Sequence, residues 1–135
     1  MGRTFLVWVI FILCAIDILL QIGSIVFLYS GAIAWPREVT ARLDAVSSDE
    51  IAVNLLVSLY WLVAGTTLFM MRRIALPLFL LGIPVDLLHY GWTVYLHGSD
   101  LFAETRSMVV AVIAVALSLL ICFYVWTLDR RGMLA

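Results

Sequence analysis

The chain contains no lysine, because its eight basic residues are all arginines. A Schiff base with retinal or pyridoxal phosphate requires a lysine amine, and so does the Walker-type phosphate-binding loop. Neither chemistry is available to this protein. The chain also lacks a block of basic residues and has a formal net charge of −1, so nucleic acid is not an expected partner.

Cysteine is almost as scarce. Cys14 and Cys122 lie far apart in apolar surroundings, with no CxxC pair and no framework for disulfides. We interpret both as small apolar residues of the interior. No serine lies in a GxSxG turn, and no loop is long enough to build an oxyanion hole. The sequence therefore predicts no catalytic residues and favours a protein that is not an enzyme.

Charged residues are scarce as a whole. They make up 13% of the 135 residues, and hydrophobic residues make up 65%. Soluble domains have about a quarter charged and about half apolar residues. This composition indicates an integral membrane protein, and the length predicts a single polytopic domain over residues 1–135.

Four apolar stretches are long enough to cross a bilayer as helices, which takes about 20 residues. They cover approximately 4–29, 51–71, 74–96 and 107–128. Because lipid offers the backbone no hydrogen bonds, the expected fold is an all-α membrane protein, an antiparallel four-helix transmembrane bundle. The small residues 32–34 resemble a signal-peptidase site, but the first run is too long and too polar for a signal peptide, so we expect a retained helix.

The distribution of arginine predicts the orientation. With four spans, the N-terminus, the turn at 72–73 and the C-terminus share one side. That side holds Arg3, Arg72, Arg73, Arg130 and Arg131. The other side holds Arg37, Arg42 and Arg106 together with Glu38, Asp44, Asp49, Glu50, Asp100 and Glu104. Positive-inside topology then places both termini in the cytoplasm, and we expect a bacterial inner membrane.

The loop over residues 30–50 is the only long one. Trp35, Val39, Leu43 and Val46 recur at near-helical spacing after Pro36, which is typical of a short amphipathic helix. We predict such a helix over approximately 36–46 at the outer interface, with Trp35 as its anchor. A capping box, Ser47-x-x-Glu50, then begins the second span.

Each span carries polar or small residues three or four positions apart, so each set occupies one helix face. The sets are Cys14, Asp17, Gln21 and Ser24; Asn54, Ser58, Trp61 and Gly65; Gly82, Asp86, His89 and Thr93; and Ser107, Ala111, Ala114, Ser118 and Cys122. We call these faces the polar seams. Polar groups hydrogen-bond across membrane helices and small residues let helices approach, so the seams should turn toward each other.

Two carboxyl groups stand at similar depth. Asp17 and Asp86 are each about a dozen residues into a span that runs outward, at a rise of about 1.5 Å per residue. We expect the first and third spans to face each other diagonally, with both acids near the midplane and Gln21 and His89 about one turn further out. Two adjacent carboxylates cannot both be ionised at low cost, so at least one of the two should be protonated at neutral pH.

An ionisable residue at the centre of a membrane helix costs about 2.5–3.5 kcal/mol and marks a functional site by default. The candidate ion, proton or substrate site consists of Asp17, Gln21, Asn54, Asp86, His89, Tyr90 and Thr93. In a proton- or cation-coupled transport or conduction protein, Asp86 would be the carrier carboxyl, Asp17 its partner and His89 the relay. Asn54 and Thr93 would line the outer approach.

Two other interpretations stay open. The seams would dock neighbouring chains if the protein were a non-catalytic accessory or assembly subunit of a larger respiratory or photosynthetic complex. In a redox subunit, His89 would contact quinone or haem. Asp86-x-x-His89 is only half of a di-iron pattern, so no metal site is predicted. The cofactor is left open, and the expected partners are the bilayer and either further copies of the chain or other membrane subunits.

Overall fold

A computed structural model describes residues 4–31, 34, 36–44, 47–97 and 105–135. Over these residues the chain forms helices and no strand. The helices are α1 (Phe5–Tyr29), α2 (Arg37–Asp44), α3 (Ser48–Phe69), α4 (Ala75–His97) and α5 (Thr105–Arg130). All except α2 are long and apolar enough to cross a membrane. The prediction of a helical chain with four helices long and apolar enough to span a membrane is therefore confirmed for the described residues.

Local sequence explains where several helices begin and end. The side chain of Ser47 accepts a hydrogen bond of 3.3 Å from the backbone N–H of Glu50, so the serine half of the predicted capping box caps α3. At the other end of the chain, Gly132 has a φ of +65° and follows α5. The backbone N–H groups of Gly132 and Met133 donate to Asp129 and Leu128, which is a Schellman cap that glycine makes without strain.

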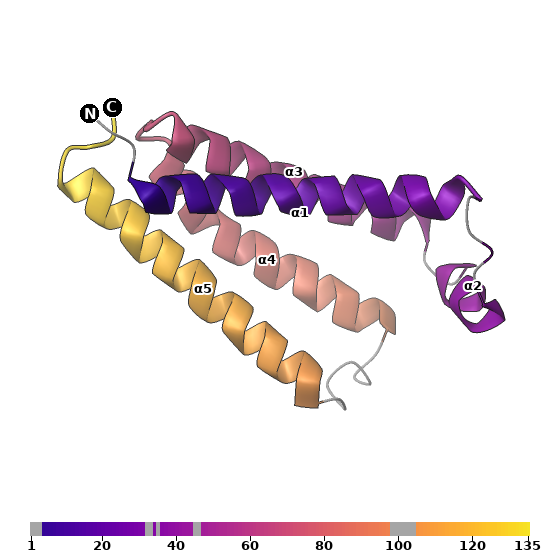
Figure 1. Cartoon of the computed structure of the whole chain (residues 1–135). Helices are drawn as coiled ribbons and strands as arrows, with labels where there is room; N and C mark the ends of the chain where they lie inside the picture. Colours follow the sequence, from indigo (N-terminus) through magenta and orange to yellow (C-terminus); the bar gives the residue numbers. More distant parts are fainter. Residues whose placement is uncertain (1–3, 32–33, 35, 45–46, 98–104) are drawn as a thin grey trace.

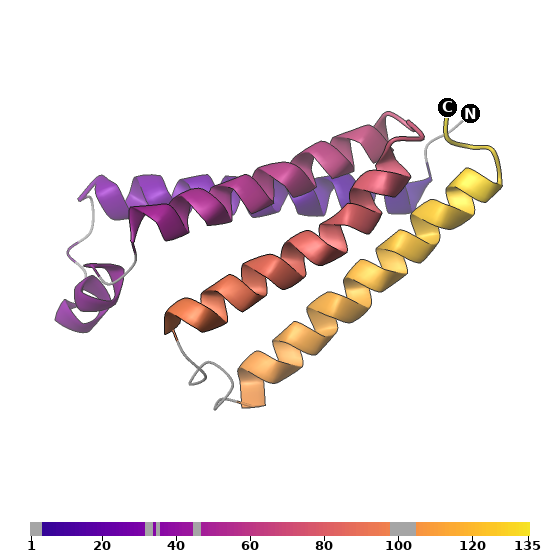
Figure 2. The same cartoon turned by 180° about the vertical axis from the view of Figure 1, so that it is seen from behind.

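The four long helices pack mainly in chain order: α1 against α3, α3 against α4, and α4 against α5 (Figures 1 and 2). The beginning of α1, the α3–α4 turn and the end of α5 lie together at one end of the molecule. From that end α1 and α5 diverge (Figure 1). We call this end the packed end and the opposite end the open end.

The hydrophobic core lies at the packed end. Its members come from the first turns of α1 and α4 and the last turns of α3 and α5, and they include Val7, Leu68, Phe79 and Val125. Most apolar side chains toward the open end are exposed, as expected for helices whose outer surface faces lipid. The buried apolar core is thus confined to the packed end.

The last residues of the chain complete the packed end. Leu134 is buried, with 2% of its surface exposed. The backbone of Ala135 pairs with the α3–α4 turn, donating to Met71 at 2.7 Å and accepting from Arg73 at 2.8 Å. The Arg73 Nε also donates to the Leu134 carbonyl at 3.2 Å. These contacts tie the C-terminal segment to the loop that joins α3 and α4.

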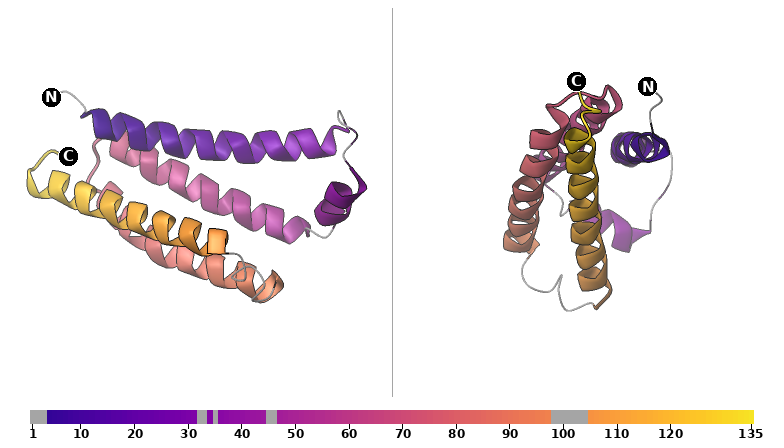
Figure 3. Two further views of the ribbon diagram at one scale, coloured as in Figure 1. Left: turned by 60° about the horizontal axis from the view of Figure 1, so that its bottom comes forward. Right: turned by 90° about the vertical axis from the view of Figure 1, so that its left-hand side faces the viewer.

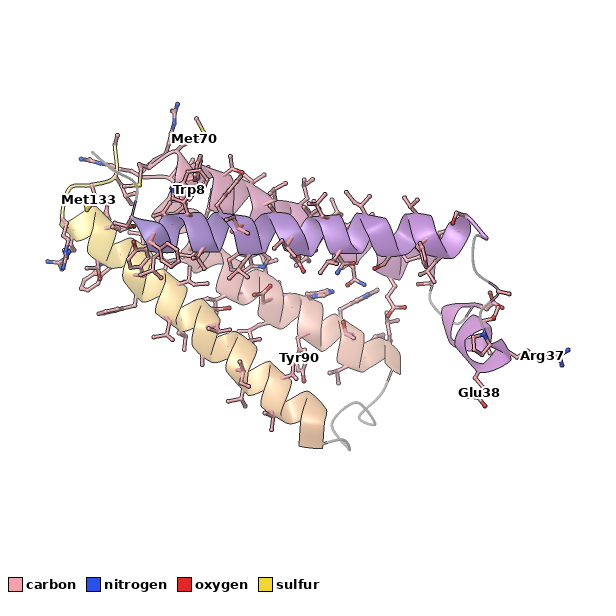
Figure 4. All side chains as sticks on the ribbon, viewed as in Figure 1. Trp8, Arg37, Glu38, Met70, Tyr90 and Met133 are labelled. Atoms are coloured by element: carbon pink, nitrogen blue, oxygen red, sulfur yellow. The ribbon has the colours of Figure 1, made fainter. Side chains whose placement is uncertain are left out.

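Helix α2 falls within the predicted range 36–46 and lies beyond the far ends of α1 and α3 (Figure 3). Arg37 and Glu38 are exposed at its first turn (Figure 4). Trp35, which we predicted as the anchor of this helix, lies outside the described residues, as do the side chains of Val39 and Leu43.

Candidate functional site

The polar seams of α3 and α4 meet through two side-chain contacts. The indole Nε1 of Trp61 donates a hydrogen bond of 2.9 Å to Oδ1 of Asp86. Closer to the open end, Nε2 of His89 and Oδ1 of Asn54 are 2.6 Å apart. Four residues of the predicted seams are therefore paired across one interface, and α3 anchors both Asp86 and His89 of α4.

Gly82 makes the first of these contacts possible. It lies one turn before Asp86, and a Cβ atom there would lie 2.5 Å from Cη2 and 2.8 Å from Cζ2 of Trp61. The absence of a side chain lets the indole lie directly against α4. The Trp61 ring also packs on Phe79, with ring centroids 5.6 Å apart. Packing against Gly82 and Phe79 therefore fixes the orientation of the Trp61 indole, whose N–H donates to Asp86.

The indole N–H of Trp61 is a contribution that the sequence did not predict, because Trp61 was placed on a polar seam but not among the candidate site residues. Its position on the polar seam near the middle of a span was the available signal. Packing and hydrogen bonding are combined here, since a tryptophan in an apolar interior needs an acceptor for its N–H. The acceptor is Asp86, one of the two midspan carboxyl groups.

A cavity of about 700 Å³ lies between α4 and α5, and Asp86 and His89 form part of its wall. It is open on one side rather than enclosed. Its polar lining consists of Asp86, His89, Tyr90 and Ser118. Figure 4 shows Tyr90 on the side of α4 that faces α5. The remaining lining is apolar: Ile83, Leu87, Val110, Ala111, Ala114, Val115 and Leu119.

The seam of α5 faces α4 along this cavity. Ala111, Ala114 and Ser118 line the cavity wall. Cys122, one turn nearer the packed end, is buried, and its thiol donates to the Phe79 carbonyl at 3.4 Å. The side chain of Ser107 lies outside the described part of the chain. Cys122 thus joins α5 to α4 on the side of the cavity nearer the packed end.

The seam of α1 behaves differently. Cys14 lies against α3, where a Cβ atom at Gly65 would be 3.1 Å from both Cβ and Sγ of Cys14. Asp17 is exposed, and Gln21 is partly exposed. Within the described residues, neither side chain has a hydrogen bond or an ion pair. The hydroxyl of Ser24 is satisfied within its own helix by the Leu20 carbonyl.

The expected pairing of Asp17 with Asp86 is not formed and is corrected here. α1 packs against α3, and Asp86 lies at the interfaces that α4 makes with α3 and α5. The two acids therefore belong to different surfaces. Of the other candidate residues, Thr93 donates its hydroxyl hydrogen to the His89 carbonyl of its own helix at 3.0 Å.

The unused atoms of the site are hydrogen-bond acceptors. One carboxyl oxygen of Asp86 accepts from Trp61, and the other has no hydrogen-bond partner among the described residues. In the neutral tautomer of His89 that donates from Nε2 to the Asn54 amide oxygen, Nδ1 is an acceptor. Across the described part of the chain, no group of three His, Cys, Asp or Glu side chains is placed to hold a metal ion.

Fold and site together define a small helical protein with four helices long and apolar enough to span a membrane, and with an acid and a histidine at the wall of a cavity between two of them. Comparison with protein-family models, with curated proteins and with solved structures gives no match.

Proposed function

We propose that this chain is a small proton- or cation-coupled transport or conduction protein, in which Asp86 is the carrier carboxyl and His89 the relay. The observation that carries the proposal is the position of both side chains at the wall of the α4–α5 cavity. His89 lies about one turn from Asp86, so a proton or cation bound at one group is within reach of the other. Imidazole exchanges protons readily near neutral pH.

The surroundings of Asp86 support a group that changes its protonation state. Asp86 has eleven residues of α4 on either side, so it occupies the centre of the span. The apolar walls favour the neutral acid, because a charge at this depth costs about 2.5–3.5 kcal/mol. The Trp61 N–H stabilises the carboxylate, by about 1.5–3 kcal/mol for a hydrogen bond to a charged group. The two effects are similar in size, so both forms are accessible.

We further propose that the helices form an antiparallel bundle in a bacterial inner membrane, with both termini in the cytoplasm. Four exposed arginines at the packed end support this orientation: Arg72, Arg73, Arg130 and Arg131. The open end carries the acidic residues of α2 and the first turn of α3. On this view α2 lies at the outer interface, and the cavity opens toward the outer half of the membrane.

Asp17 favours a second candidate function, that of an accessory or assembly subunit. Its exposed carboxyl has no partner among the described residues, and lipid offers none. Asp17 and Gln21 are one turn apart on α1, so one helix of another chain can contact both. A neighbouring subunit or a second copy would satisfy these groups, and an oligomer is compatible with transport as well.

The third candidate is a redox subunit that binds quinone or haem. It uses His89 and the same cavity, and a haem-bound form would show visible absorbance after purification in mild detergent. Partner chains that co-purify in fixed ratio would instead favour the accessory subunit.

The proposal predicts proton flux that depends on Asp86. Liposomes holding the purified protein and an internal pH-sensitive dye are given a membrane potential, and proton entry is compared with protein-free liposomes. Asp86→Asn should lower the protein-dependent flux by about tenfold or more, corresponding to at least about 1.4 kcal/mol in the barrier. The amide keeps the size of the side chain but cannot exchange a proton.

Asp17→Asn provides the matched control, because it makes the same chemical change in a different span. We expect its flux to equal that of the wild type. Equal flux in the wild type and in Asp86→Asn would overturn the carrier role of Asp86, and wild-type flux no greater than that of protein-free liposomes would overturn the proposal for transport as a whole.

A further inference from the structure

The cavity between α4 and α5 is larger and more apolar than proton exchange requires. One water molecule occupies about 30 Å³ of liquid, whereas this cavity measures about 700 Å³. Pockets for drug-sized molecules cover roughly 300–1,000 Å³ and have mostly apolar walls with a few polar groups. Seven of the eleven lining residues are apolar, so the space suits a compact lipophilic body.

The polar groups of the cavity select the kind of head group. As a carboxylate, Asp86 has one oxygen without a partner among the described residues, and a neutral His89 that donates from Nε2 has Nδ1 as an acceptor. The Ser118 hydroxyl donates its hydrogen to the Ala114 carbonyl at 3.0 Å, so its oxygen lone pairs are left as acceptors. Tyr90, the fourth polar residue of the lining, has a hydroxyl that can donate or accept. With Asp86 ionised, acceptors outnumber donors in the cavity and fit a ligand that donates hydrogen bonds.

The charge of Asp86 also favours a ligand that carries a positive charge. Asp86 forms no ion pair with an arginine in the described residues, and the chain has no lysine. The group that can place a positive charge near this carboxylate is His89, one turn away on the same helix, and a neutral His89 leaves the carboxylate without a cation among the described residues. An ammonium group would supply both the positive charge and N–H donors, because a primary ammonium has three N–H bonds and no acceptor.

We infer that the α4–α5 cavity binds a lipophilic ammonium compound, with its nitrogen at Asp86 and its apolar body between the two helices. This inference rests on the proposed function, since the ammonium and the proton compete for one carboxyl. When Asp86 is protonated, binding of one ammonium releases one proton to water, and the charge of the site is unchanged.

The rim of the cavity gives such a compound a route of entry. Leu87 on α4 and Val110, Val115 and Leu119 on α5 line the cavity and are each more than half exposed, so the cavity is open at this edge. In a bilayer this rim faces lipid. A compound already dissolved in the membrane therefore reaches Asp86 sideways, without passing through the packed end.

Binding is measured with a matched pair of probes, 3,3-diphenylpropylamine and its neutral isostere 3,3-diphenylpropanol. The protein is placed in lipid nanodiscs and dialysed to equilibrium against each labelled probe at neutral pH, with protein-free nanodiscs as the background. We expect saturable binding of the amine and at least about tenfold weaker binding of the alcohol. A tenfold difference corresponds to about 1.4 kcal/mol.

Three variants assign the binding to the cavity. Asp86→Asn should remove the preference for the amine over the alcohol. Ala114→Leu adds bulk to the cavity wall and should weaken both probes by about tenfold or more. Ala116→Leu makes the same change on α5 at an exposed residue outside the cavity, so it should bind both probes like the wild type. Both alanines are exposed, so neither change disturbs the core at the packed end.

Three results would overturn the inference: no saturable binding above the protein-free background, equal affinity for amine and alcohol, or an amine preference that survives in Asp86→Asn. Equal affinity would indicate an apolar occupant such as a lipid chain. The flux assay separates the two proposals. Flux that depends on Asp86 without amine binding removes the inference alone, and amine binding with flux indifferent to Asp86 removes the transport function alone.

Discussion

Replacing Gly82 with alanine should destabilise the protein and break the hydrogen bond between Trp61 and Asp86. The added methyl carbon would lie 2.5 Å from Cη2 of Trp61, which is far inside van der Waals contact. Trp61 is large, rigid and already packed on Phe79, so the indole must move away from α4. Overpacking of this kind costs about 1–3 kcal/mol. Alanine is favoured over glycine in a helix by only about 1 kcal/mol, so the clash dominates.

Gly91→Ala is the matched control on the same helix, because nothing lies within 4 Å of a Cβ atom there. It should leave the stability unchanged or raise it by up to about 1 kcal/mol. The free energy of unfolding is measured by titrating a mixed-micelle solution with denaturing detergent, and the Trp61 indole N–H is followed by NMR. Equal stability of the two variants, with the Trp61 N–H signal unmoved, would show that α3 and α4 do not approach as described.

A second core substitution, Phe79→Ala, should cost about 3 kcal/mol. Phe79 is only 1% exposed and contacts the Trp61 ring, while its carbonyl accepts the Cys122 thiol. Truncating a buried phenylalanine costs about 3–5 kcal/mol in soluble proteins. In lipid the transfer part of that cost is small, so the lost packing contacts dominate and the lower end of the range is expected.

The control for Phe79→Ala is Phe123→Ala on α5, where the ring is 64% exposed. It should change the free energy of unfolding by less than about 0.5 kcal/mol, as surface substitutions do. The same detergent titration compares both variants. If Phe123→Ala were as destabilising as Phe79→Ala, the exposed side of α5 would carry as much packing as the core, and the described boundary of the core would be wrong.

The four spans were predictable from the sequence because hydropathy is a local property. A run of apolar residues long enough to cross a bilayer has to form a helix whatever surrounds it. The predicted spans agree with the observed helices within a few residues, as in α1, predicted over 4–29 and found at Phe5–Tyr29. The start of α3 at Ser47 was readable for the same reason, since a cap depends only on its own turn.

The sequence predicted only in part which helix packs against which. Periodicity shows which residues share a face, but it does not name the helix opposite that face. Asn54 and His89 do meet, whereas Asp17 turns away from Asp86 because α1 packs on α3. Gly82 was identified as one of the small residues of a seam, yet its role depends on the position of the Trp61 ring. The cavity depends on how α4 and α5 pack against each other, which no local pattern encodes.

The central claim is that Asp86 exchanges protons with water beside the α4–α5 cavity, and infrared spectroscopy tests it most directly. Carboxyl groups outside the membrane are ionised at neutral pH, so the C=O stretch of a protonated carboxyl reports on the spans alone. The difference spectrum between wild type and Asp86→Asn should contain such a band at neutral pH. It should shift in D2O, lose intensity as the pH rises, and be retained in Asp17→Asn. A difference spectrum without this band, or a band that neither shifts in D2O nor responds to pH, would contradict the account.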